Sequence, residues 1–324
     1  MSATATTNAP PERRTDAYME LLRRCKPLEP AITAVAFPCE ESALAGPVEA
    51  AKAGLISPIL VGPRQQIRAV ATSVGLNIDS YEIEDVPDAH AAAARAVELV
   101  RTARAEILMK GSLHTDELMG AVVASATGLR TGRRISHAFV MSVPTYPKPL
   151  IVTDAAINIA PTLDEKRDIC QNAIDLAHSL GRDMPKVAIL SAVETVTTRI
   201  PSTIEAAALC KMAERGQITG ALVDGPLAMD NAINLEAART KGIDSPVAGD
   251  ADILVAPDLE AGNILAKQLT FLAKADAAGL VLGARVPIIL TSRADSVRVR
   301  MASCGVALLV AHARRTGQSE NKRT

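Results

Sequence analysis

One short apolar run of this sequence ends in side chains that can bind anions and move protons. The run "PIILTSR" (287–293) ends in Ser292 and Arg293, and Asp295 follows two residues later. A hydroxyl, a guanidinium and a carboxylate at the end of a buried strand could hold a phosphate group and accept a proton. An ordinary strand-to-helix turn that is capped by Ser or Asp would contain the same residue types.

Similar side chains follow several other apolar runs. The candidate residues at these points are Lys110, Ser112, His114, Thr115, Asp154, Asn158, Ser191, Asp224 and Asn263. Each of them could equally be a solvated turn residue or a helix N-cap, whereas Arg293 is harder to explain in that way. Taken together, these cationic, hydroxyl and carboxylate groups favour an anionic substrate bound at one rim of a sheet.

The elements that would position these residues alternate regularly along the chain. Short apolar runs are separated by Ala-rich segments with helical periodicity, such as residues 88–103 and 162–181. The runs cover residues 32–37, 58–62, 106–111, 136–143, 150–154, 186–192, 220–225, 252–258 and 287–293. Strands and helices that alternate at this spacing predict a parallel α/β sheet, whose ligands lie beyond the carboxyl ends of the strands.

The composition agrees with such a fold and excludes some functions. A chain of 324 residues favours two domains, and 48% hydrophobic residues with only 2% aromatic ones predict a core of Ala, Val, Leu and Ile. The formal net charge of −1 and the few aromatic rings argue against nucleic-acid binding. The proline-rich stretch 143–152 is a candidate crossover between the two domains.

The chain carries no sequence signal for a membrane or for secretion. Its apolar runs are shorter than a membrane span, and its first residues resemble a disordered tail rather than a signal peptide. Five cysteines without a CxxC pair predict reduced thiols in a cytoplasmic protein. Neither His nor Cys has the spacing of a metal site, so we expect no protein-bound metal.

Familiar phosphate-binding motifs are missing. The segment "GALVDGP" (220–226) has Pro226 where a P-loop needs Lys, and no GxGxxG follows a strand. The basic segment "GLRTGRR" (128–134) is either a solvated loop or a contact for a polyphosphate such as coenzyme A. Cys304 is expected to pack in an apolar helix, and an acyl-cysteine nucleophile is the alternative.

Six motifs in order give the chain a family resemblance. They are "MKGSLHT", "TDAAINIAP", "KVAILSAVE", "VDGPLAMDNAI", "SPVAGDADILVAPDLEAGNI" and "LTSRADS", between about residues 105 and 310. With these motifs the chain resembles the phosphate acetyl/butyryltransferase family, and "GLRTG", "RIPST", "VDGPLA" and "TSRADS" resemble the butyryltransferase branch more closely. The resemblance implies a homodimer that transfers an acyl group reversibly between coenzyme A and phosphate, without a tightly bound cofactor.

The resemblance also implies roles for particular residues. A Ser-Arg pair that contacts the phosphate end of the substrate in the acetyl branch matches Ser292 and Arg293. The carboxylate proposed in that branch as the base for the thiol of coenzyme A falls at Val299, and an arginine of that branch falls near Ala121. Because neither of these residues can replace the missing group, Asp295 is the nearest candidate for the base.

The implied fold consists of two α/β domains that flank a cleft, as in the isocitrate and isopropylmalate dehydrogenases. We expect a disordered tail at residues 1–16, a first domain from 17–141 plus 288–324, and a second domain from 142–287. The substrates would carry acyl groups from acetyl to butyryl. Two alternatives remain: an NAD- and metal-dependent β-decarboxylating dehydrogenase of similar fold, and a non-catalytic protein that binds coenzyme A or acyl phosphate.

Overall fold

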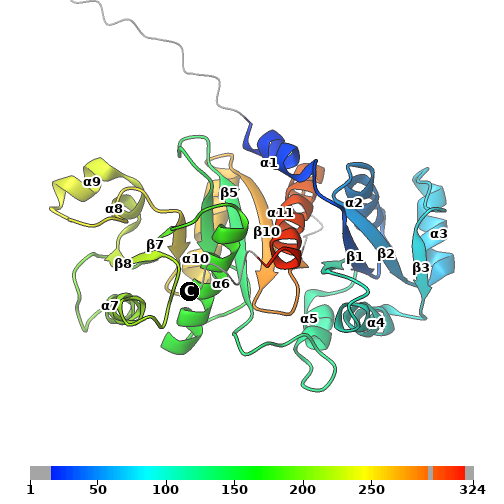
Figure 1. Ribbon diagram of the computed structural model, residues 1–324, viewed down its shortest axis with the longest axis horizontal. Coiled ribbons are helices and arrows are strands. Elements are labelled where there is room, and N and C mark those ends of the chain that lie inside the picture. The colour runs from blue at the N-terminus through cyan, green and yellow to red at the C-terminus, as the bar shows by residue number, and fades with distance from the viewer. Residues whose placement is uncertain (1–15, 291–294, 318–324) are drawn as a thin grey trace, which may run out of the picture.

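A single mixed sheet runs through the protein (Figure 1). The computed structural model describes residues 16–290 and 295–317, so the expected tail lies outside the described residues except for its last one. The 11 strands lie in the order β3-β2-β1-β4-β11-β10-β5-β6-β9-β7-β8. Their bounds are β1 Ala31–Ala36, β2 Ile56–Gly62, β3 Glu82–Asp85, β4 Ile107–Lys110, β5 Ser136–Ser142, β6 Leu150–Thr153, β7 Lys186–Leu190, β8 Leu222–Leu227, β9 Ile253–Val255, β10 Asp276–Leu282 and β11 Ile288–Ile289.

Helices follow most of the strands and cover the sheet. They are α1 Ala17–Cys25, α2 Glu41–Lys52, α3 Arg64–Ser73, α4 Ala89–Arg101, α5 Thr115–Val123, α6 Leu163–Ser179, α7 Pro201–Glu214, α8 Met229–Ile233, α9 Leu235–Thr240, α10 Leu259–Phe271 and α11 Val297–Arg315. None of the helices in the described part of the chain is long and apolar enough to cross a membrane. The α/β class that the sequence predicted is confirmed.

Local sequence explains where the predicted helices begin. Asp88 caps α4 by accepting the N–H of Ala91 at 2.8 Å, and Thr162 caps α6 by accepting the N–H of Glu165 at 3.4 Å. The Ala-rich face of α4 is buried, which lets the helix approach β1 and β2 closely. The core is accordingly built from small and aliphatic side chains, as the composition predicted.

The strands do not all run in one direction. Strands β3, β2, β1, β4 and β11 are parallel to one another, and so are β6, β9, β7 and β8. Between these two groups β10 is antiparallel to both β11 and β5, and β5 is antiparallel to β6. The carboxyl ends of the two groups therefore lie at opposite edges of the continuous sheet.

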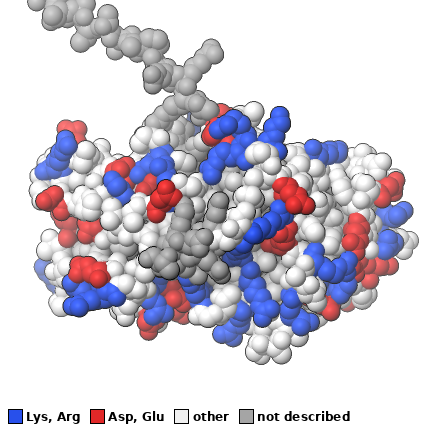
Figure 2. Space-filling view, in the orientation of Figure 1, with Lys and Arg blue, Asp and Glu red and all other residues white. Residues whose placement is uncertain are grey.

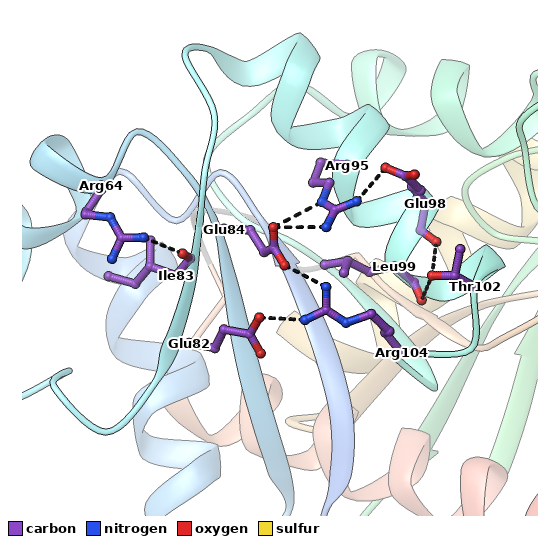
Figure 3. A network of polar contacts seen from close by, with 9 residues as sticks. All are labelled: Arg64, Glu82, Ile83, Glu84, Arg95, Glu98, Leu99, Thr102 and Arg104. Carbon is purple, nitrogen blue, oxygen red and sulfur yellow. Dashed lines mark hydrogen bonds and ion pairs between the residues drawn. The ribbon is translucent and has the colours of Figure 1, made fainter.

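Two strands were missed in the sequence. Strand β3 has the sequence "EIED" and lies at the edge of the sheet, where Glu82 and Glu84 form ion pairs with Arg104, and Glu84 also binds Arg95 (Figure 3). Such charges prevent an edge strand from pairing with a strand of another chain. Strand β10, "DAAGLVL", follows α10 directly, and its Ala and Gly resemble the helical segments.

The proline-rich stretch joins the neighbouring antiparallel strands β5 and β6. Tyr146 of this stretch is buried, and its hydroxyl donates a hydrogen bond to the carbonyl of Ala251 at 2.7 Å. Lys148 forms ion pairs with Asp250 and Asp252, at 2.8 and 2.9 Å. These contacts hold the connection against the start of β9.

Elsewhere on the surface, acidic and basic side chains are interspersed over the face shown in Figure 2.

Candidate active site

The turn after β4 brings a lysine and a serine next to the end of β1. The ammonium group of Lys110 donates hydrogen bonds to the carbonyls of Gly111 and Leu113, at 3.2 and 3.1 Å. The hydroxyl of Ser112 donates to the carbonyl of Phe37 at 2.8 Å. Lys110 therefore lies over its own turn, and Ser112 ties this turn to the neighbouring strand.

Gly111 lets the turn pass close to β1. A Cβ atom at this position would lie 2.4 Å from the carbonyl oxygen of Ala36 and 2.5 Å from that of Phe37, which no side chain could tolerate. The glycine of "MKGS" is therefore needed so that the backbone can approach the neighbouring strand. Its presence fixes the position of Lys110 and of the residues that follow.

Helix α5 begins directly after this turn. His114 is its N-cap residue and Thr115 its first residue, and both are exposed. The N–H of His114 donates to the carboxylate of Glu117 at 2.9 Å, so this backbone donor is satisfied locally. The positive end of the helix lies beside Lys110, an arrangement that suits an anion.

Strand β11 ends beside the same turn. It pairs in parallel with β4, with Ile289 opposite Met109, so the chain leaves the sheet at Leu290 next to Lys110. Ser292 and Arg293 lie outside the described residues. Asp295 is half-buried, and the N-cap of α11 is Ser296, whose hydroxyl accepts the N–H of Val299 at 3.3 Å.

A second group of candidate residues lies after β6 and is centred on Asp154. This carboxylate is 3% exposed and accepts hydrogen bonds from four backbone N–H groups and from the side-chain amide of Asn158. The backbone donors belong to His137, Ala156, Ile157 and Asn158, at 2.9 to 3.3 Å. Asp154 therefore holds the turn of "TDAAIN" in one shape.

Asn158 and Asn263 extend this turn to its neighbours. Asn158 donates to the carbonyl of Ile135 at 2.9 Å and accepts from the Nε atom of Arg134 at 2.6 Å. Asn263, in the first turns of α10, donates to the carbonyl of Ala155 at 2.9 Å. The structure thus brings Asp154, Asn158 and Asn263 into one hydrogen-bonded group.

Ser191 and Asp224 lie on the two outermost strands beyond this group. The hydroxyl of Ser191 lies 2.8 Å from that of Ser202 in α7, and the residue is almost completely buried. Asp224 is not at the end of its strand: it lies inside β8, paired with Ala188 of β7. Neither residue hydrogen-bonds to the turn at Asp154 in the described structure.

The expectation that all candidates share one rim is wrong. Lys110, Ser112, His114 and Thr115 lie at the edge where β4 and β11 end. Asp154 follows β6 at the opposite edge, and three strands separate β4 from β6 in the sheet. The reason is the three successive antiparallel pairings β11–β10, β10–β5 and β5–β6, whose odd number reverses the strand direction between the two groups.

The basic segment 128–134 is largely engaged in ion pairs. Arg133 pairs with Asp175, and Arg134 pairs with Glu165 at 3.0 Å in addition to its bond to Asn158. Arg130 is exposed. The segment therefore helps to hold α6 against the sheet. Arg134 is exposed as well but is paired with Glu165, so Arg130 is the better candidate for a polyphosphate contact.

Cys304 lies where the sequence predicted, in an apolar stretch of α11. Its side chain is completely buried, and burial raises the pKa of the thiol to about 12. A thiol with such a pKa is a poor nucleophile, so the acyl-cysteine alternative loses support.

One residue near the site was missed in the sequence. Arg300 is 6% exposed and donates a hydrogen bond to the carbonyl of Ser42 at 2.7 Å, so it links α11 to the start of α2. The pattern "VRVRM" offered a weak signal for it, because an arginine lies within an apolar helix. Its buried position holds the first turns of α11, which follow Ser292 and Arg293 along the chain.

Comparison with known proteins identifies the class of this protein and then its family. A family model described as "Phosphate acetyl/butaryl transferase" matches residues 89–307. The expected enzyme class, an acyltransferase, is thereby confirmed. The chain belongs to the phosphate acetyl/butyryltransferase family.

Individual relatives agree with this assignment over nearly their whole length. The chain is 67% identical to a phosphate acetyltransferase of Rhizobium meliloti, covering 93% of this chain and 95% of that protein. It is 41% identical to a phosphate butyryltransferase of Clostridium acetobutylicum, covering 91% and 98%. These identities do not favour the butyryltransferase branch, which the motifs had suggested.

A solved structure shares the fold. A branched-chain phosphotransacylase from Enterococcus faecalis V583 superimposes with a TM-score of 0.76 at 32% sequence identity. The match covers 87% of this chain and 99% of that one. The architecture described above is therefore that of a phosphate acyltransferase, and the dehydrogenase alternative is not favoured.

Proposed function

We propose that the protein transfers a short acyl group, from acetyl to butyryl, reversibly between coenzyme A and inorganic phosphate. A phosphate oxygen attacks the thioester carbonyl in a ternary complex, the C–S bond breaks, and the thiolate of coenzyme A leaves. In reverse, the thiolate attacks the carbonyl of the acyl phosphate and phosphate leaves. Orientation of the two reactants, rather than a covalent nucleophile, lowers the barrier.

The parallel pairing of β4 and β11 is the observation that carries this proposal. It supports a site in which Lys110 and the N-terminus of α5 lie next to the strand that leads into Ser292 and Arg293. We assign the phosphate to the guanidinium of Arg293, because its fork binds two phosphate oxygens at once. Ser292 supplies a neutral donor, and Lys110 adds positive charge.

Asp295 is our candidate for the base that accepts the thiol proton. Val299, at the position of the carboxylate in the acetyl branch, cannot take up a proton. Because Ser296 caps α11, Asp295 is not required for that structural role. A thiol with an ordinary pKa of about 8.5 needs such help at neutral pH.

We assign the group at the opposite edge to binding of the remaining parts of the substrates. Asp154 and Asn158 are engaged in hydrogen bonds within their own turn, which supports a role in shaping the backbone there. Other residues that we assign to substrate binding are Ser112, His114, Thr115, Ser191, Asp224 and Asn263.

The two edges can serve one site if the protein has two halves that face a cleft. We propose the halves 17–141 plus 288–324 and 142–287, arranged as in the isocitrate and isopropylmalate dehydrogenases. The parallel strands β3, β2, β1, β4 and β11 all fall in the first half and the parallel strands β6, β9, β7 and β8 in the second, which supports this division. The final strand β11 pairs with β4, which supports its assignment to the first half.

We further propose a cytoplasmic homodimer without a tightly bound cofactor or metal. Helix α10 exposes Ile264 and Phe271, and the adjoining Leu272 is 79% exposed, which supports a contact with a second copy. The five cysteines are all free thiols, which supports a reducing compartment. Sedimentation of the protein and of the variant Phe271→Asp tests the dimer.

Thiol release from acyl-CoA tests the function. The purified protein should release the thiol of acetyl-, propionyl- or butyryl-CoA only when phosphate is present. Binding of these compounds without turnover would instead favour the non-catalytic alternative, and NADH formation from a hydroxy acid would favour the dehydrogenase. Failure to exchange phosphate for coenzyme A on all three substrates would rule out the proposal.

A further inference from the structure

A cavity of about 610 Å³ lies between α1, α6 and α11, next to the strands β5, β6 and β10. Its volume falls within the range of small-molecule sites, roughly 300–1,000 Å³, and is about four times that of a cavity that holds benzene. Most of its wall is aliphatic. The main apolar side chains are Leu21, Val140, Ile151, Ala278, Ala302 and Val306.

The sequence leaves this space open because small residues occur where the elements face each other. Ala278 of β10 and Ala302 of α11 are both buried, at 3% and 6% exposure, and both line the cavity. A larger residue at either position would fill part of the space. Helix α1 lies across the cavity and contributes Leu21 and Arg24 to its wall.

Among the charged residues that line the cavity, Arg24 has no ion pair within the described residues. Its acidic side chains already pair with cations, as Glu20–Arg23, Asp252–Lys148, Asp252–Arg182 and Asp276–Arg298. Arg24, by contrast, makes no hydrogen bond or ion pair with any residue of 16–290 or 295–317. Its guanidinium lies beside the end of α6, where a Cβ atom on Gly181 would be 3.6 Å from it. Its charge acts on Glu20 through space. Within the described residues, a guanidinium without a hydrogen-bonded partner thus adjoins an apolar cavity.

We propose that this cavity binds an amphiphilic monocarboxylate with a hydrocarbon chain of about eight to ten carbons. The chain lies among the apolar side chains, and the carboxylate binds the guanidinium of Arg24. Complementarity of charge favours this occupant over the N-terminal residues 1–15, whose sequence holds two arginines and only one large aliphatic side chain, Met1. The site lies outside the proposed active site and does not depend on the acyl-transfer reaction.

Calorimetric titration of the full-length protein with octanoate and with 1-octanol tests this proposal. We expect both probes to bind at one saturable site per chain, and Ala278→Leu to weaken both by at least tenfold because it fills the cavity. Arg24→Gln should weaken octanoate about tenfold and leave octanol unchanged, since only the acid uses the charge. Lys26→Gln, two residues later and exposed, is the matched control and should change neither.

Several results would overturn the proposal. These are the absence of saturable octanoate binding, an unchanged affinity in Ala278→Leu, and equal effects of Lys26→Gln and Arg24→Gln. Displacement of octanoate by coenzyme A would assign the probe to the active site instead. A sedimentation coefficient that falls on addition of octanoate would mean that a second copy of the chain occupies the cavity. Ala302→Leu, from the facing wall, repeats the test if Ala278→Leu does not fold.

Discussion

His137 should make the protein sensitive to mild acid. This residue of β5 is 3% exposed, its ring packs edge-on against Phe139, and its Nδ1 atom has no hydrogen-bond partner within the described chain. Burial lowers the pKa of the imidazole from 6.5 to about 4, and the nearby carboxylate of Asp154 offsets this only in part. The folded protein therefore keeps His137 neutral at pH values where an exposed histidine is protonated.

The size of the effect follows from the two pKa values. Unfolded chains bind a proton at His137 near pH 6.5, whereas the folded protein does not until about pH 4. Lowering the pH through this window therefore favours unfolding. Between pH 7.5 and 5.0 the free energy of unfolding should fall by about 2 kcal/mol on account of this residue. The full stability is present above pH 6.5 and is lost progressively as the pH falls toward 4.

Urea denaturation at pH 7.5 and 5.0 measures the effect. His137→Leu removes the titrating ring. Between pH 7.5 and 5.0 the free energy of unfolding of this variant should therefore fall by about 2 kcal/mol less than that of the unaltered protein. His90→Leu, at an exposed position of α4, is the control and should lose as much as the unaltered protein. Equal losses in His137→Leu and the unaltered protein would refute the reasoning.

The other predictions concern the proposed site. Arg293→Lys keeps the positive charge but loses the two-pronged guanidinium contact, so the KM for phosphate should rise roughly tenfold or more. Ser292→Ala should raise this KM less. A phosphate dependence of the rate that Arg293→Lys leaves unchanged would contradict our placement of the site. Asp295→Asn should lower kcat strongly and leave KM nearly unchanged, whereas lower stability at an unchanged rate would argue for a structural role. Gly111→Ala should reduce both stability and activity, because the added Cβ would lie 2.4 Å from a backbone carbonyl oxygen. Gly120→Ala, where nothing lies within 4 Å of the added Cβ, is its control; it should keep the activity and not lower the stability, because Ala favours a helix more than Gly does.

Much of the local structure could be predicted from the sequence. Most of the expected apolar runs contain a strand, and α4 and α6 lie within residues 88–103 and 162–181. Hydrophobic periodicity and N-cap residues are local properties, so they survive in the folded chain. The motif "MKGSLHT" likewise predicted a functional turn, whose glycine the close approach to β1 explains.

The arrangement of the strands could not be predicted in the same way. The segment "DAAGLVL" contains Ala and Gly that suit a helix as well as a strand, and only its pairing with β5 and β11 makes it β10. Because β10 and β5 reverse the direction of the sheet, they separate Lys110 from Asp154. Pairing between distant segments depends on long-range contacts, which a local pattern does not contain.

The same distinction applies to individual side chains. The sequence by itself determined that Asp154 follows a strand and that Cys304 lies in an apolar segment. Only the tertiary structure decided that Asp154 is buried under four backbone donors and that burial raises the pKa of Cys304. It also decided that α1 and α11, far apart along the chain, enclose one cavity with α6. Residue types and local propensities are properties of the sequence itself. Burial, charge pairing and cavities arise only when distant segments pack together.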